Sequence, residues 1–141
     1  MPRLFPVLLA LLLLLPPEAL GAGPEALERG ATSLAVEIVD GDTLTLENGI
    51  EVRLVGIQAP RLPLGRAGFE AWPLSGEAKE ALAALALGRA LTLYYGGRKH
   101  DRYDRALAHL VRADGLWLQG ELLAQGMARV YSFRDNRRAR C

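Results

Sequence analysis

Two aspartates and two arginines stand out in the sequence as side chains that could bind charged ligands. Asp40 and Asp42 flank a glycine directly after an apolar segment, and carboxylate oxygens are the ligands that hard divalent cations prefer. Arg53 lies inside an otherwise apolar run, and Arg105 ends a charged loop. A guanidinium donates two parallel hydrogen bonds to a phosphate and keeps its proton, so it suits the stabilisation of charge during phosphoryl transfer. These residue types could bind a cation and an anion, and by themselves they leave the ligand open.

The charges are distributed unevenly along the chain. The 17 basic and 16 acidic residues give a net charge of +1, which excludes a histone-like polycation and a strongly acidic disordered chain. Residues 22–88 hold 10 acids and 5 bases, whereas residues 89–141 hold 11 bases and 5 acids. An acidic half that could hold a cation, beside a basic half that could hold a polyanion, fits phosphodiester binding. Two solvated faces of ordinary charge would give the same counts.

Cysteine and histidine are too few for the metal or disulfide chemistry that they often carry. The one cysteine is Cys141, which excludes an intrachain disulfide and a cysteine-based zinc cluster. The two histidines, His100 and His109, are too few for a histidine-rich metal site.

The elements that must position the candidate residues are five short strands and two helices. Alternating β-branched and apolar residues predict strands at 33–39, 43–47, 50–57, 90–95 and 106–111. Dense helix formers ended by glycine predict helices at 77–87 and 118–125. Asn48-Gly49 is a strong hairpin signal, and residues 58–76 form a long loop. A mainly β chain with a helix between its third and fourth strands predicts a five-stranded OB-fold barrel with a short second helix.

The first residues predict export. Arg3 precedes an apolar run at 4–15, and small residues follow it, which is the layout of a signal peptide over 1–21. We expect a loosely ordered leader at 22–32, a barrel domain at 33–133 and a solvated basic tail at 134–141. The mature protein is expected to be secreted or periplasmic, monomeric, and without a stable membrane anchor once the signal peptide is cleaved.

Several segments together resemble the staphylococcal nuclease (thermonuclease-like) domain family. They are VDGDT at 39–43, VRLVGIQAP at 52–60, DRYDRALA at 101–108, ADG at 113–115 and LAQGMA at 123–128. Each is weak alone, but their order and spacing over 34–133 are specific. The resemblance implies an OB barrel that hydrolyses DNA or RNA with calcium. In that family two carboxylates bind the calcium ion, two arginines bind the phosphate, and a glutamate activates water.

The resemblance assigns roles to five residues of this chain. Asp42 matches the first calcium carboxylate, although an aspartate in such a turn often only bonds its own backbone. Arg53 and Arg105 match the two catalytic arginines that bind the phosphate. Arg102 and Tyr103 match positions near the nucleotide, so nucleic acid or another phosphodiester is the expected partner.

Two positions depart from the family pattern. Gln58 stands where the second calcium carboxylate is expected, and Arg61 stands where the catalytic glutamate is expected. An amide lacks the negative charge that calcium binding favours, so we expect calcium to dissociate in the millimolar range or more weakly. A guanidinium cannot take a proton from water, so it cannot act as a general base. Arg61 is expected either to pair with Asp42 or Asp40 in place of the cation, or to join the phosphate contacts.

Three functions follow from this pattern. The first is a phosphodiester-binding domain with weak or no cleavage, and the second is an active calcium-dependent nuclease that uses a substitute base. The third is a protein-interaction module on the same barrel. The sequence offers four residues that could replace the missing base, Glu70, Glu77, His100 and His109. Each also has an ordinary explanation, as an exposed residue, a residue at a helix start or a packing residue. Trp72 and Trp117 are expected to pack rather than to stack on bases.

Overall fold

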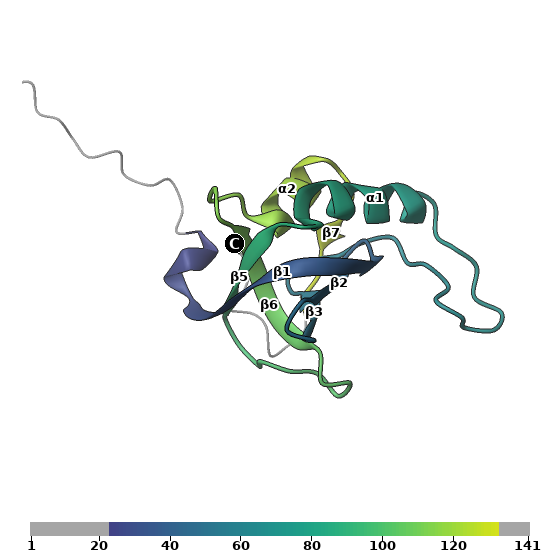
Figure 1. Cartoon of the computed structure of the whole chain (residues 1–141). Helices are drawn as coiled ribbons and strands as arrows, with labels where there is room; N and C mark the ends of the chain where they lie inside the picture. Colours follow the sequence, from purple (N-terminus) through teal and green to yellow (C-terminus); the bar gives the residue numbers. More distant parts are fainter. Residues whose placement is uncertain (1–22, 133–141) are drawn as a thin grey trace, which may run out of the picture.

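Five strands close into a barrel because each turns its apolar residues to one side. The computed structural model describes residues 23–132. The barrel runs in the order β1-β2-β3-β6-β5 and closes on itself, which confirms the predicted OB-type barrel (Figure 1). Its strands are β1 (Glu28–Asp40), β2 (Thr43–Leu46), β3 (Glu51–Leu54), β5 (Ala90–Tyr95) and β6 (Ala106–Arg112).

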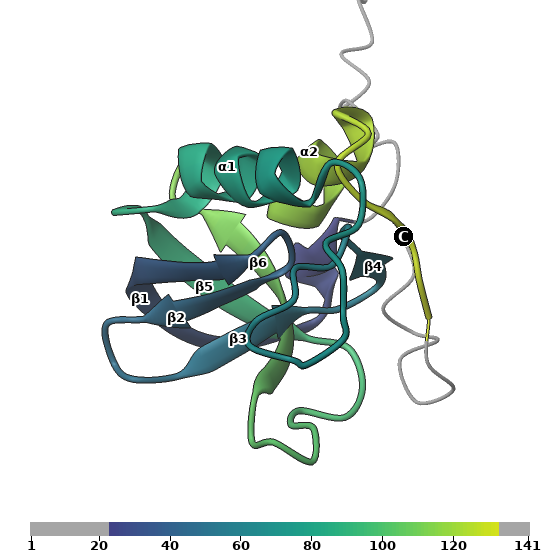
Figure 2. The ribbon, with the colours of Figure 1, turned by 90° about the vertical axis from the view of Figure 1, so that its right-hand side faces the viewer.

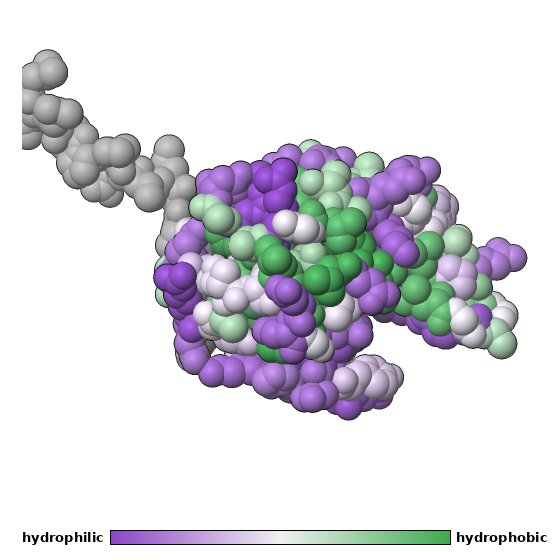
Figure 3. Space-filling model, viewed as in Figure 1, coloured by the Kyte–Doolittle hydropathy of each residue, from purple (hydrophilic) through white to green (hydrophobic). Residues whose placement is uncertain are grey.

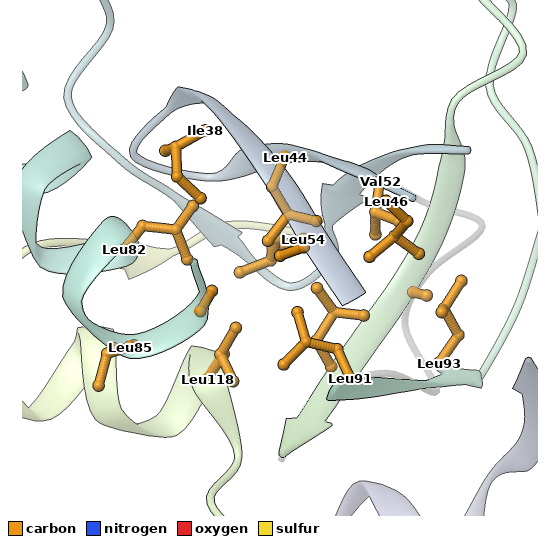
Figure 4. Close-up of a cluster of buried hydrophobic side chains, with 14 of the residues drawn as sticks. Ile38, Leu44, Leu46, Val52, Leu54, Leu82, Leu85, Leu91, Leu93 and Leu118 are labelled. Carbon is orange, nitrogen blue, oxygen red and sulfur yellow. The ribbon is translucent and has the colours of Figure 1, made fainter. Parts of the chain in front are cut away.

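The two helices lie together over one end of the barrel (Figure 2). They are α1 (Ser75–Ala86) and α2 (Leu118–Ala124), close to the predicted bounds. Their leucines meet those of the strands in one core, where Leu82, Leu118 and Leu54 are fully buried (Figure 4). Burying a leucine side chain stabilises a fold by about 1.5–3 kcal/mol, so this core holds the barrel and the helices as one unit.

The pairing of β3 with β6 positions the candidate arginines. These strands are parallel, and Val52 pairs with Ala106 while Arg53 pairs with Leu107. Val52 and Ala106 are fully buried in the barrel. Because successive side chains of a strand point to opposite faces, Arg53 and Leu107 lie on the outer face.

The structure differs from the predicted strands at two places. β1 begins at Glu28, inside the segment expected to be a loose leader, after the one-turn helix η1 (Pro24–Ala26). This first part of β1 pairs with β5 but is largely exposed, so it shows no alternation in the sequence. The predicted strand 50–57 breaks at Gly56, whose φ of +80° ends β3. Its end becomes β4 (Ile57–Gln58), which pairs with the unpredicted two-residue strand β7 (Arg129–Val130).

The predicted signal peptide at 1–21 and basic tail at 134–141 lie outside the described residues. Within residues 23–132, neither helix combines the length and the apolar character that crossing a membrane requires.

Candidate phosphodiester site

The tight turn between β1 and β2 buries Asp42. The backbone N–H of Asp42 donates to Asp40 Oδ1 at 3.0 Å, as expected for an aspartate turn. Gly41 allows the turn to press against the neighbouring elements, since a Cβ there would lie 2.7 Å from the Ala59 Cβ and 2.8 Å from the Ala78 Cβ. Asp42 is only 3% exposed as a result.

Hydrogen-bond donors surround the Asp42 carboxylate. Its Oδ2 accepts the backbone N–H of Ala59 at 2.8 Å and the side-chain amide of Gln58 at 3.2 Å. The Arg53 Nη2 lies 3.4 Å from the same oxygen. Its Oδ1 accepts the Thr43 hydroxyl at 3.3 Å. Both carboxylate oxygens are therefore occupied by groups of the protein itself.

Arg53 is held by the backbone as well as by Asp42. Its Nη2 donates to the carbonyl of Ile57 at 3.0 Å and reaches the Gln58 Oε1 at 3.5 Å. Its Nη1 donates to the Leu54 carbonyl. With its side chain 15% exposed, Arg53 closes the turn between β3 and β4. We call Asp42, Arg53 and Gln58 the Asp42 cluster.

Burial decides the ionisation of Asp42. Loss of water raises its pKa from 3.8 to about 6, although the Arg53 guanidinium lowers it. The neighbouring Asp40 carboxyl adds to the increase in pKa. Placing the carboxylate in this turn therefore costs more than its attraction to Arg53 returns.

Replacing Asp42 with asparagine is expected to change how stability depends on pH. An aspartate whose folded pKa exceeds its unfolded value binds more protons when folded, so its contribution to stability falls as pH rises from 3.8 to about 6. That gap in pKa corresponds to about 3 kcal/mol. In urea unfolding, the free energy of unfolding of the parent should fall by about 3 kcal/mol relative to that of Asp42→Asn as the pH rises from 3.5 to 7.

Asp114 provides the control for the pH experiment. A hydrogen bond from Arg112 lowers its pKa to about 2, so its contribution to stability rises with pH between about 2 and 3.8. Between pH 3.5 and 7 the difference between the parent and Asp114→Asn should therefore stay almost constant, unlike the difference between the parent and Asp42→Asn. A difference between the parent and Asp42→Asn that does not vary with pH would contradict the prediction.

The residues around Asp42 do not fit a calcium ion. Calcium takes six to eight oxygen ligands, and carboxylates supply most of the charge in its protein sites. Here an N–H of Gln58, an N–H of Ala59 and a guanidinium face the carboxylate of Asp42. Across residues 23–132, no group of three or more histidine, cysteine, aspartate or glutamate side chains could hold a metal ion.

The alternative that Arg61 pairs with Asp42 or Asp40 is wrong. Its guanidinium carbon lies 5.6 Å from the ring centroid of Trp72, and the described part of the chain holds no ion pair to Arg61. The Trp72 backbone N–H donates to the Arg61 carbonyl at 2.9 Å, which keeps the two residues together. Arg53, fixed by two backbone carbonyls, takes the place beside Asp42.

The loop between β5 and β6 arranges the second group of candidate residues around Asp101. Its Oδ2 accepts the Arg105 Nε at 2.7 Å, and its Oδ1 accepts the backbone N–H groups of Tyr103 and Arg105. The Arg102 guanidinium donates to the Tyr103 hydroxyl at 2.6 Å and lies 4.7 Å from its ring centroid. Asp101 orients Arg105 here, a function that the motif alone did not reveal.

Arg53 lies on β3, and Arg105 lies in the loop directly before the neighbouring strand β6. Arg105 directly precedes Ala106, which pairs with Val52 on β3. Adjacent strands are about 4.8 Å apart, and side chains alternate between faces, so this register brings both arginines to the outer face. That they bind one phosphate stays a prediction.

The substitute bases lie in ordinary positions. Glu70, Glu77 and His100 are exposed. His109 is buried, and its Nδ1 accepts the Trp117 Nε1–H at 3.1 Å. This bond agrees with the packing function that the sequence predicts for His109 and Trp117.

Comparisons with known proteins agree with the family resemblance of the sequence. The family model described as staphylococcal nuclease homologue matches residues 51–140. A probable staphylococcal-like nuclease, CAN1 of Oryza sativa subsp. japonica, is 35% identical over 86 residues. The alignment covers 61% of this chain and 23% of the rice protein, so the chain spans about a quarter of the length of that relative. This chain belongs to the staphylococcal nuclease homologue family.

Proposed function

We propose that the protein is an exported domain that binds nucleic acid or another phosphodiester and cleaves it weakly or not at all. The observation that carries this proposal is the Asp42 cluster. The Arg53 guanidinium neutralises the carboxylate that the family would place on calcium, the Gln58 amide donates a hydrogen bond to it, and no carboxylate stands at positions 58 and 61. General-base catalysis contributes about 10²–10⁴ in rate, so its loss removes most of the activity without affecting binding.

The binding part of the proposal rests on the basic loop between β5 and β6. Arg105 has one nitrogen on Asp101, and its side chain is 28% exposed. Arg102 and Tyr103 are exposed beside it. A polyanion would meet charged donors here without entering the Asp42 cluster. The family match and the rice relative, whose name describes a nuclease, favour nucleic acid among the phosphodiesters.

An assay of binding and cleavage on one labelled single-stranded oligonucleotide tests the proposal. Fluorescence anisotropy at several salt concentrations should show binding that weakens as salt increases. Gel analysis with calcium and with EDTA should show little cleavage in either. Rapid EDTA-sensitive cleavage would establish the active nuclease instead, and no binding at any salt would favour the protein-interaction module.

Calcium titration tests the metal part separately. Calorimetry should give a dissociation constant in the millimolar range or weaker, at the weak end of protein calcium sites. Micromolar binding in dilute buffer would contradict the proposal.

Replacing Arg105 with alanine should weaken oligonucleotide binding and reduce its salt dependence. Each phosphate contact to a single strand contributes about 0.7 to the slope of log affinity against log salt, so the slope should fall by about that amount. Arg89→Ala is the matched control, because it removes the same charge far from Arg105. Arg89 directly precedes β5, beside the end of β6 at Arg112, whereas Arg105 lies before the start of β6. Equal losses in the two variants would show that only net charge matters.

A further inference from the structure

The loop from residue 59 to 74, between β4 and α1, keeps its shape through contacts of its own. The Trp72 backbone N–H donates to the Arg61 carbonyl at 2.9 Å. Arg66 donates from Nη2 to the Leu62 carbonyl at 2.9 Å and from Nε to the Pro63 carbonyl at 3.1 Å. We call this segment the aromatic loop, and it projects from the barrel at the right of Figure 1.

The aromatic loop carries two arginine–aromatic pairs on the surface. The Arg61 guanidinium carbon lies 5.6 Å from the Trp72 ring centroid, and that of Arg66 lies 4.2 Å from the Phe69 ring centroid. Trp72 is 40% exposed. A large ring left in water beside a cation gains little from burial, so packing alone does not account for it.

The aromatic loop begins at the candidate site. Ala59, its first residue, donates its backbone N–H to Asp42, and Arg61 follows two residues later. The loop passes in front of the barrel in Figure 2, with the β5–β6 loop below it. Figure 3 shows a recess between the projection at the right and the one at the bottom of the molecule. On the β5–β6 loop, Tyr103 is 65% exposed and also lies against a guanidinium.

We propose that Trp72 stacks on a base of single-stranded nucleic acid, with Arg61 beside it to contact the strand. This inference rests on the proposed function and names its substrate class. Aromatic rings combined with basic side chains are the means by which proteins bind single strands without reading sequence. In a duplex the bases are already stacked inside the helix, so Trp72 would gain nothing from a duplex. A strand that extends to the β5–β6 loop would meet Tyr103 as a second exposed ring.

Binding of an oligothymidylate by the parent, Trp72→Ala and Trp72→Phe tests this inference. Stacking of one base corresponds to about 5- to 150-fold in affinity, so Trp72→Ala should bind at least about 5-fold more weakly. Trp72→Phe should keep most of the affinity because a phenyl ring also stacks. The salt slope should stay unchanged in both, unlike in Arg105→Ala, and duplex binding should be unaffected.

Leu74→Ala is the matched control, since Leu74 is 52% exposed on the same loop and has no π face. An equal loss in Leu74→Ala would make the loop a general apolar docking surface and overturn the inference. Fluorescence provides a second readout, because in a Trp117→Phe chain the remaining emission comes from Trp72 and should be quenched by the oligonucleotide. If the parent binds the oligonucleotide but shows no quenching and Trp72→Ala loses no affinity, the stacking inference is refuted and the proposed function stands. If the parent binds no oligonucleotide, both are refuted.

Discussion

Replacing Arg53 with alanine is expected to lower the free energy of unfolding by about 3 kcal/mol at pH 8. Removing one partner of a buried ion pair costs about 3–5 kcal/mol, because the other charge stays buried without compensation. Asp42 is that partner, with its side chain 5% exposed and its Oδ2 3.4 Å from the Arg53 Nη2. The carbonyls of Leu54 and Ile57 lose their guanidinium donors in the same variant. Urea unfolding of the parent and the variant measures the loss.

The loss should shrink as the pH falls. Arg53 lowers the pKa of Asp42 toward about 6, so in its absence the folded pKa rises further above 3.8. The stability that Arg53 contributes through this charge is fully present only above the raised pKa that Asp42 has in the variant, and it is lost by about pH 6, below which the Asp42 carboxyl is protonated and needs no counter-charge. Arg102→Ala is the control, because Arg102 is exposed and should cost less than about 0.5 kcal/mol. A loss that stays the same at pH 5 would mean that Arg53 acts through its backbone bonds alone.

The barrel could be predicted because its strands carry local signals. The hairpin at Asn48-Gly49 and the strands at 90–95 and 106–111 combine clear turn residues with apolar runs, and the structure has β2, β5 and β6 there. The start of β1 and the two-residue strands β4 and β7 could not be predicted in the same way. An exposed strand shows no alternation, and two residues are too few for any period.

The candidate site was predictable as a set of positions but not as a set of contacts. The motifs placed Asp42 in a turn and Arg53 in a strand, which the structure confirms. Whether Arg53 or Arg61 neutralises Asp42 depends on which guanidinium the fold places beside the carboxylate. Two backbone carbonyls hold the Arg53 guanidinium beside the Asp42 carboxylate. Arg61 lies at the start of the aromatic loop, where its guanidinium lies against the Trp72 ring instead. Residues this far apart in sequence leave no periodic signal, so the pairing of Arg61 with Trp72 could be seen only in three dimensions.

Combining Gln58→Asp with Arg61→Glu is expected to raise calcium-dependent cleavage by about 10²–10⁴ over the parent, the usual contribution of a general base. The first change adds a second carboxylate beside Asp42 and removes the amide that now donates to it. Arg61→Glu removes a positive charge close to the Asp42 cluster and supplies a carboxylate that can accept a proton from water. Gel assays of oligonucleotide cleavage with calcium and with EDTA measure the effect.

Single variants separate the two contributions. Gln58→Asp alone should strengthen calcium binding in calorimetry but leave cleavage slow, because no base is present. Arg61→Gln removes the charge without adding a base, so it should also cleave slowly and serves as the neutral control for Arg61→Glu. If the double variant binds calcium and still cleaves at the parent's rate, residues 58 and 61 are not the defect. The pairing of Arg53 with Asp42 would then be the feature that keeps the phosphate arginine from its substrate, since Asp42 and two backbone carbonyls already hold the Arg53 guanidinium.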